Sequence, residues 1–108
     1  MSSTLGDFEQ LVLLALVRLG PGTYGATIRR EIEERTGREL GISAVYTTLQ
    51  RLEHKGFVRL RHGEPLAARG GRRRKHVDLL PPGARALKAS LDAFHSMTAG
   101  VERRLNQL

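Results

Sequence analysis

The sequence predicts a mainly α-helical protein with a small β-hairpin. Three helix-forming segments precede residue 57, two short strand-like segments then flank a loop rich in Gly, Pro and Arg, and a heptad-patterned segment ends the chain. Three helices followed by a two-stranded wing is the order of a winged helix-turn-helix. We therefore expect a winged helix-turn-helix domain over residues 1–80 and a C-terminal dimerisation helix over residues 81–108.

Length and composition indicate a small cytoplasmic protein. The chain has 108 residues and no cysteine, which excludes disulfides, thiolate metal sites and a cysteine nucleophile. No apolar run reaches the roughly twenty residues that span a bilayer. The first residues, MSSTLGDFEQ, lack the layout of a signal peptide. Because so short a chain builds only a modest core, oligomerisation is a fair expectation.

The first two helices are expected to supply most of the core. Residues 8–19 (FEQLVLLALVRL) are almost entirely apolar, with Asp7 as the expected N-cap, so this helix must be covered on most sides. The second helix is expected from Thr23, which can cap it, to Gly37. Its apolar side repeats at i, i+4 and i+8, and most of its charged residues are interpreted as simply solvated.

The third helix, residues 43–55, is the candidate recognition helix, with Ser43 as its expected N-cap. Its apolar side recurs at i, i+4 and i+7, and the opposite side carries hydroxyls, an amide and a guanidinium. Such groups hydrogen-bond base edges and phosphates in a major groove. Taken alone, an amphipathic helix with a merely solvated face fits equally well. The inward residues are Val45, Leu49 and Leu52, and the outward ones are Ser43, Thr47, Gln50, Arg51 and His54.

Residues 57–61 (FVRLR) and 76–80 (HVDLL) are expected to pair as an antiparallel hairpin. The net charge of the chain is +7, and residues 57–80 carry most of this excess. A localised basic patch is typical of a protein that binds a polyanion. The alternative is that the basic surface only keeps the protein soluble.

The last segment predicts one continuous helix from Ala84 to the C-terminus, after Pro81-Pro82-Gly83. Its apolar residues follow an a/d heptad pattern, although Thr98 and Gly100 weaken it. A helix of 25 residues is roughly 37 Å long, more than one small domain can cover, so a partner helix is expected. The predicted dimerisation residues are Leu87, Leu91, Phe94, Thr98, Val101 and Leu105.

The chain resembles the PadR family of bacterial transcriptional regulators over about residues 5–87. The resemblance lies in LGDFEQLVLLALVRLG, YGATIRREIEERTGREL, AVYTTLQRLEHKGFV, GEPLAARGGRRRKHVDL and PGARAL, in this order. It implies a dimeric winged-helix repressor of operator DNA, often responsive to a small molecule, of the subgroup with a single C-terminal dimerisation helix. Two departures are the wing strand KHVDLL, which lacks the usual aromatics, and the absence of Trp, which puts stacking of planar drugs in doubt.

The predicted DNA contacts fall into three groups. Ser43, Thr47, Gln50 and Arg51 are expected nearest the bases. Thr23 and Tyr24 could offer backbone N–H groups and a hydroxyl to a phosphate, and the basic wing should grip the backbone or an adjacent minor groove. The resemblance makes Tyr46 look like a phosphate contact, and the alternative is that its ring packs between helices. The predicted wing contacts are Arg72, Arg73, Arg74 and Lys75.

The sequence assigns no definite effector site. Phe8, Leu11, Leu87, Phe94 and Met97 could line a cavity between terminal helices, although plain core residues fit better. The four histidines lack paired spacing, so neither a metal nor another cofactor is expected. The sequence also lacks the motifs of a nucleophile elbow and a phosphate-binding loop, so the protein is not expected to be an enzyme.

Two further functions compete with that of a DNA-binding regulator. A winged-helix module that binds a protein would centre on apolar or aromatic anchors, which the polar, Arg-bearing face does not offer. An RNA-binding or structural nucleoid protein would keep the charge and lose sequence specificity. The predicted partners are double-stranded operator DNA, a second copy of the chain and, as the resemblance implies, a small-molecule effector, with no membrane.

Overall fold

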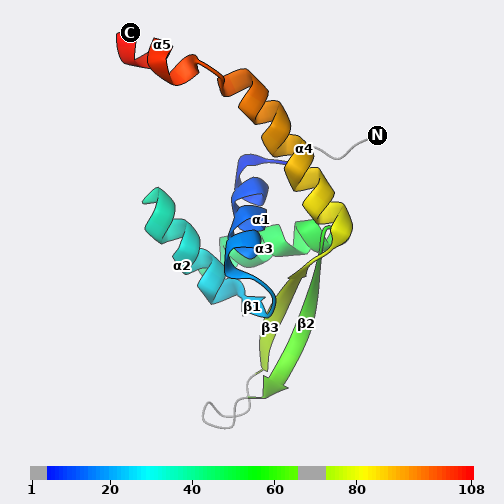
Figure 1. Ribbon diagram of the computed structural model, residues 1–108. Coiled ribbons are helices and arrows are strands. Elements are labelled where there is room, and N and C mark those ends of the chain that lie inside the picture. The colour runs from blue at the N-terminus through cyan, green and yellow to red at the C-terminus, as the bar shows by residue number, and fades with distance from the viewer. Residues whose placement is uncertain (1–4, 66–72) are drawn as a thin grey trace.

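The computed structural model describes residues 5–65 and 73–108 and contains five helices and a small sheet in those ranges (Figure 1). Mainly helical architecture with a β wing confirms the predicted fold class. The elements in chain order are α1 (Asp7–Leu19), β1 (Thr23–Tyr24), α2 (Gly25–Thr36), α3 (Ile42–His54), β2 (Val58–Pro65), β3 (Arg73–Leu79), α4 (Pro81–Thr98) and α5 (Val101–Gln107).

Helix α1 lies at the centre of the fold, as its apolar composition predicts. It contacts α2, α3, β3 and the first part of α4, which surround it in Figure 1. Val12 and Leu13 are completely buried, and they meet Ile28 of α2 and Val45 of α3 in one continuous cluster. Full burial of a Val, Leu or Ile side chain contributes about 1.5–3 kcal/mol, so this cluster holds the three helices in one arrangement.

The sheet has three strands in the order β1–β3–β2, not the two that the sequence predicts. Thr23 pairs with Val77 and Tyr24 with His76 in antiparallel register. The wing strands β2 and β3 are also longer toward the wing tip than predicted. A two-residue strand has no periodicity to detect, because it exists only through its pairing with a distant strand.

Three helix N-caps lie one or two residues away from those expected. Helix α1 begins at Asp7 with Gly6 as N-cap, and the Glu9 carboxylate accepts the Gly6 N–H at 2.9 Å. In α2 the N-cap is Tyr24, while Thr23 lies in β1. In α3 it is Gly41, so that Ser43 lies within the first turn. The prediction that Asp7, Thr23 and Ser43 cap these helices is therefore wrong. None of the three observed N-cap residues makes a capping hydrogen bond through its side chain.

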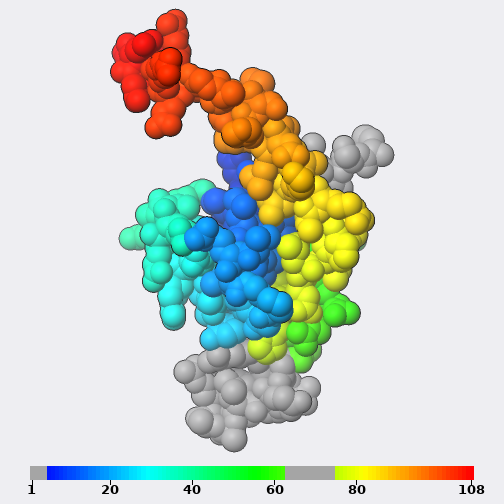
Figure 2. All heavy atoms as spheres, in the orientation of Figure 1, coloured from blue at the N-terminus to red at the C-terminus, as the bar shows by residue number. Residues whose placement is uncertain are grey.

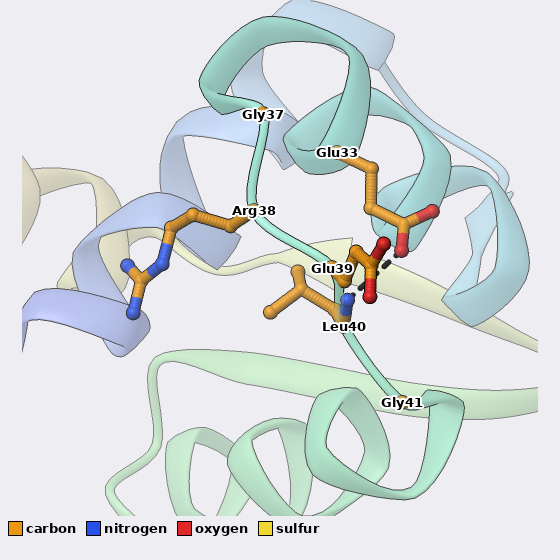
Figure 3. A pocket seen from close by; sticks show the side chains of 6 residues that line it. All are labelled: Glu33, Gly37, Arg38, Glu39, Leu40 and Gly41. Carbon is orange, nitrogen blue, oxygen red and sulfur yellow. Dashed lines mark hydrogen bonds between the residues drawn. The ribbon is translucent and has the colours of Figure 1, made fainter.

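The turn between α2 and α3 is held by one side chain. The Glu33 carboxylate accepts the backbone N–H of Leu40 at 2.9 Å and also pairs with Arg29. Figure 3 shows this contact beside an open hollow of about 730 Å³, with the Arg38 side chain pointing away from Glu33. The hollow gathers no set of convergent polar groups, and we interpret Glu33 as fixing the entry of the chain into α3.

The C-terminal segment is two helices, and the prediction of one continuous helix is wrong. Helix α4 ends at Thr98, and Gly100 has a φ of 77°, which lies in the left-handed region. Glycine adopts this conformation without the steric cost that other residues bear. The helix is therefore interrupted here, although the heptad pattern of apolar residues continues beyond it. Figure 2 shows the second half of α4 and all of α5 projecting away from the body. Within residues 5–65 and 73–108, every helix is too short or too polar to span a bilayer.

Candidate nucleic-acid interface

Helix α3 presents the two faces that its sequence predicts. Val45, Leu49 and Leu52 have no exposed surface. The hydroxyl of Thr48 is also turned inward, where it donates to the Ala44 carbonyl at 2.9 Å. The opposite face is open to solvent and holds hydrogen-bonding groups along its whole length. Its exposed residues are Ser43, Thr47, Gln50, Arg51 and His54.

The outer face of α3 borders an open hollow of about 560 Å³, to which the start of α1 contributes Glu9. Glu9 of α1 lines it and pairs with Lys55, the C-cap of α3, with 2.9 Å between Oε1 and Nζ. Sequence reasoning missed both residues, and only the spacing of Glu9 three residues after Gly6 signals a special role for this carboxylate. We refer to this feature as the α3 hollow, and it is lined by Glu9, Thr47, Gln50, Arg51, His54 and Lys55.

The Glu9 carboxylate is partly buried and remains ionised. Burial raises the pKa of Glu9, but the Gly6 N–H and the Lys55 ammonium, helped by the charge of Arg51, outweigh burial and leave the pKa below its ordinary value. Its side chain is 12% exposed, against 27% for Lys55. The α3 hollow therefore holds a fixed negative charge beside the candidate base-reading residues.

Tyr46 packs against the backbone at the start of α2. A Cβ added to Gly25 would lie 2.7 Å from the Tyr46 Cζ and 2.9 Å from its hydroxyl oxygen. The ring therefore packs between helices, which was the alternative to a phosphate contact. Tyr46 remains half-buried, so its packing leaves the phosphate role untested.

Thr23 and Tyr24 point to opposite sides of the sheet. Thr23 is 7% exposed, and its hydroxyl oxygen has no hydrogen-bond partner within the described residues. Tyr24 lies on the outer face, where its ring meets His76 edge-on with 6.3 Å between centroids. His76 Nδ1 lies 2.8 Å from the Gly22 carbonyl oxygen. Only Tyr24 of the two thus offers a side chain at the surface.

The described part of the wing carries an ion-pair cluster on the outer face of the sheet. Asp78 accepts two hydrogen bonds from Arg61, and Arg59 Nη2 lies 3.5 Å from Asp78 Oδ2. The hydrogen bond from Arg61 is the main reason that the pKa of Asp78 lies below its ordinary value. Neither arginine was predicted as a site residue.

The predicted wing contacts are only partly described. Lys75 is half-buried, and its backbone lies opposite that of His62 in the register of β2 and β3. Arg73 and Arg74 belong to β3, and their side chains lie outside the described residues. Arg72 lies outside them altogether.

The predicted dimerisation residues change from buried to exposed along the C-terminal helices. Leu87 is 4% exposed and Leu91 packs partly against the core, while the Ser90 hydroxyl donates to the Gln10 side chain at 2.7 Å. Phe94 is 63% exposed and Leu105 60%. Thr98 and Val101 are exposed as well. A single chain thus leaves the distal half of the predicted seam uncovered.

A helix with a polar, arginine-bearing outer face, held against two other helices and followed by a basic β-hairpin, defines the class of winged helix-turn-helix DNA-binding proteins. The chain matches the model of the transcriptional regulator PadR-like family over residues 13–89, and it belongs to this family. It is therefore a DNA-binding transcriptional regulator and not an enzyme. No curated protein matches the chain in a sequence search.

Solved structures of the same fold extend over nearly the whole chain. A PadR family transcription regulator from Clostridium difficile has a TM-score of 0.76 and 23% identity, and the match covers 93% of this chain and 99% of that one. A PadR family transcriptional regulator from Eggerthella lenta has a TM-score of 0.70 and 24% identity, and the match covers 89% of this chain and 81% of that one. The complex structure of hsRosR-S1 has a TM-score of 0.66 and 28% identity, covering 94% of this chain and 84% of that one.

Proposed function

We propose that the protein binds a two-fold operator as a homodimer, represses transcription by occupying a promoter, and is released by a small-molecule effector. The observation that carries this proposal is the division of α3 into a face whose apolar residues Val45, Leu49 and Leu52 are completely buried and an exposed face that carries the polar side chains. Residues that pack in the core cannot read DNA, so discrimination between sequences falls to the exposed face. On this proposal residues 1–80 bind DNA and residues 81–108 dimerise.

Base readout is assigned to the exposed side chains of the first three turns of α3. A bidentate contact from Arg51 to guanine, or from Gln50 to adenine, is worth about 1–3 kcal/mol of discrimination. Ser43 and Thr47 add hydroxyls at the N-terminal end of the helix. All four are exposed, so docking in a major groove requires no repacking of the core.

Phosphate contacts are assigned to both flanks of α3. Tyr24 contributes its hydroxyl, Thr23 only its backbone since its side chain is buried, and Tyr46 its hydroxyl edge. On the other flank the basic wing binds the backbone or the neighbouring minor groove, which makes binding strongly salt-dependent. The proposed wing contacts remain Arg72, Arg73, Arg74 and Lys75.

Dimerisation is supported by the apolar side chains that the single chain leaves in solvent. Phe94, Met97 and Leu105 are each more than half exposed and lie on helices that leave the body of the fold. Large exposed apolar patches mark interaction sites in soluble proteins. A second copy would cover them and set two recognition helices about one turn of DNA apart. An effector bound between the terminal helices would then alter that separation and release the operator.

The test is a gel-shift titration of the full chain on its own promoter fragment and on an unrelated duplex, each at two salt concentrations. We expect tighter binding to the promoter fragment and a steep loss of affinity with salt. Equal affinity for both duplexes would indicate a structural nucleoid role and contradict the proposal. Absence of salt dependence would contradict the role of the basic wing.

A further inference from the structure

Three of the four proposed base-reading side chains share one hollow with a carboxylate. Thr47, Gln50 and Arg51 line the α3 hollow together with Glu9, which comes from a different helix. A carboxylate opposes the phosphates of DNA within a Debye length, about 10 Å at 0.1 M salt. A negative charge in this position weakens the electrostatic attraction to DNA of any sequence. The presence of Glu9 therefore cannot be explained by a gain in affinity.

Glu9 is held in place by contacts with both α1 and α3. Its carboxylate accepts the Gly6 N–H at 2.9 Å and pairs with Lys55 at 2.9 Å, and its side chain is only 12% exposed. Lys55 is the C-cap of α3, with its own N–H bonded to the Arg51 carbonyl at 3.0 Å. The backbone of α1 and the end of α3 thus hold the two charges together.

We propose that Glu9 is a specificity-determining residue of the DNA interface, whose carboxylate pairs with Lys55 and so cancels a positive charge that would bind a phosphate of any sequence. Affinity for unrelated DNA comes almost entirely from neutralised phosphates. Neutralising the charge of Lys55 beside the exposed face of α3 lowers the affinity for unrelated DNA, while the base contacts of α3 are retained. This inference rests on the proposed function, because it requires α3 to face DNA.

The central experiment measures binding of the full chain to its own promoter fragment and to an unrelated duplex over a salt series. Glu9→Gln removes the charge and keeps an oxygen that can accept the Gly6 N–H, as glutamine does in capping boxes. We expect unrelated DNA to bind about fivefold to tenfold more tightly at about 0.1 M salt, with a salt slope about one unit steeper. The promoter fragment should gain less, because base contacts fix the register of α3 on it, whereas on unrelated DNA the protein can shift until Lys55 meets a phosphate. The ratio of the two affinities therefore falls.

Two further variants separate the pair from general charge effects. Glu34→Gln makes the same change in net charge at an exposed position of α2 outside the α3 hollow, and we expect it to leave the salt slope unchanged. Glu9→Gln combined with Lys55→Gln should lose most of the gain, because the cation released by the first change is then absent.

The outcomes divide clearly. If Glu9→Gln behaves like Glu34→Gln while the wild-type protein still prefers its promoter, the proposed function stands and the role of Glu9 is overturned. Equal losses of affinity for both duplexes together with a lower Tm would show that Glu9 is purely structural, which also overturns it. If the wild-type protein shows no preference for its promoter, the proposed function itself fails.

Discussion

The ring of Tyr46 lies directly on the backbone of Gly25, so that a methyl group at Gly25 would stand 2.7 Å from the ring carbon that bears the hydroxyl. This contact joins α3, the proposed recognition helix, to the first residue of α2. In the proposed function α2 supports α3 against DNA, so the contact would set part of the geometry of that interface.

Gly25→Ala is expected to destabilise the fold, because the new methyl group must displace the Tyr46 ring or separate the two helices. Overpacking of this kind typically costs about 1–3 kcal/mol. The free energy of unfolding, measured by urea denaturation, checks the effect. The double variant Gly25→Ala with Tyr46→Ala should cost less than the sum of the single variants. Strict additivity of the two changes would contradict the contact.

Thr23→Val is expected to leave stability unchanged or to increase it by about 1 kcal/mol, because it replaces a buried hydroxyl that lacks a partner in the described structure with a methyl group. Thr23→Ser is the matched control, since it keeps the hydroxyl and loses buried apolar surface, and it should be destabilising. Thermal unfolding of the three proteins compares them. A lower Tm for Thr23→Val than for Thr23→Ser would show that the hydroxyl has a favourable partner.

Asp78→Asn is expected to lower stability at neutral pH and to have no effect in acid. The hydrogen bond from Arg61 lowers the pKa of Asp78 in the folded state from its ordinary value of 3.8. A lowered pKa means that the stabilisation is complete above the ordinary value and is lost as the pH falls through the folded-state value. Tm measured from neutral pH to below pH 3.8 should show the wild-type and variant curves converging. A constant difference across this range would contradict the ion pair.

Phe94→Glu is expected to weaken the proposed dimer, since it places a charge on a side chain that is 63% exposed in the single chain. Loss of a buried Phe contact, worth about 1.5–3 kcal/mol, should raise the dimer Kd at least about tenfold. Ser96→Glu, at an exposed polar position of the same helix, is the control. Light scattering after size exclusion measures the mass, and a wild-type monomer at every concentration would exclude this interface.

The features that sequence could predict are those with a local cause. The buried and exposed faces of α3 follow from the 3.6-residue period, which places Val45 and Leu49 on one side whatever surrounds the helix. The apolar composition of α1 likewise requires a central position. The wing hairpin follows from short alternating segments around a loop rich in Gly and Arg.

The features that sequence could not predict depend on distant partners or on a backbone choice. Strand β1 exists because Thr23 meets Val77, and the pair of Glu9 and Lys55 joins residues 46 positions apart. No periodicity encodes either contact. The break at Gly100 lies within a heptad pattern whose apolar residues continue on both sides of it. The pattern therefore does not record the positive φ, which a glycine takes at little cost.

The most direct test of base readout by α3 compares the wild-type protein with Arg51→Ala on a set of promoter duplexes that carry single base changes. The guanidinium is exposed and outside the core, so the variant should fold normally. We predict that discrimination falls by about 1–3 kcal/mol at one position in each half-site and is retained elsewhere. Arg104→Ala on α5 serves as the control for loss of a positive charge. If Arg51→Ala keeps the discrimination of the wild-type protein at every position, α3 does not read DNA in the way proposed.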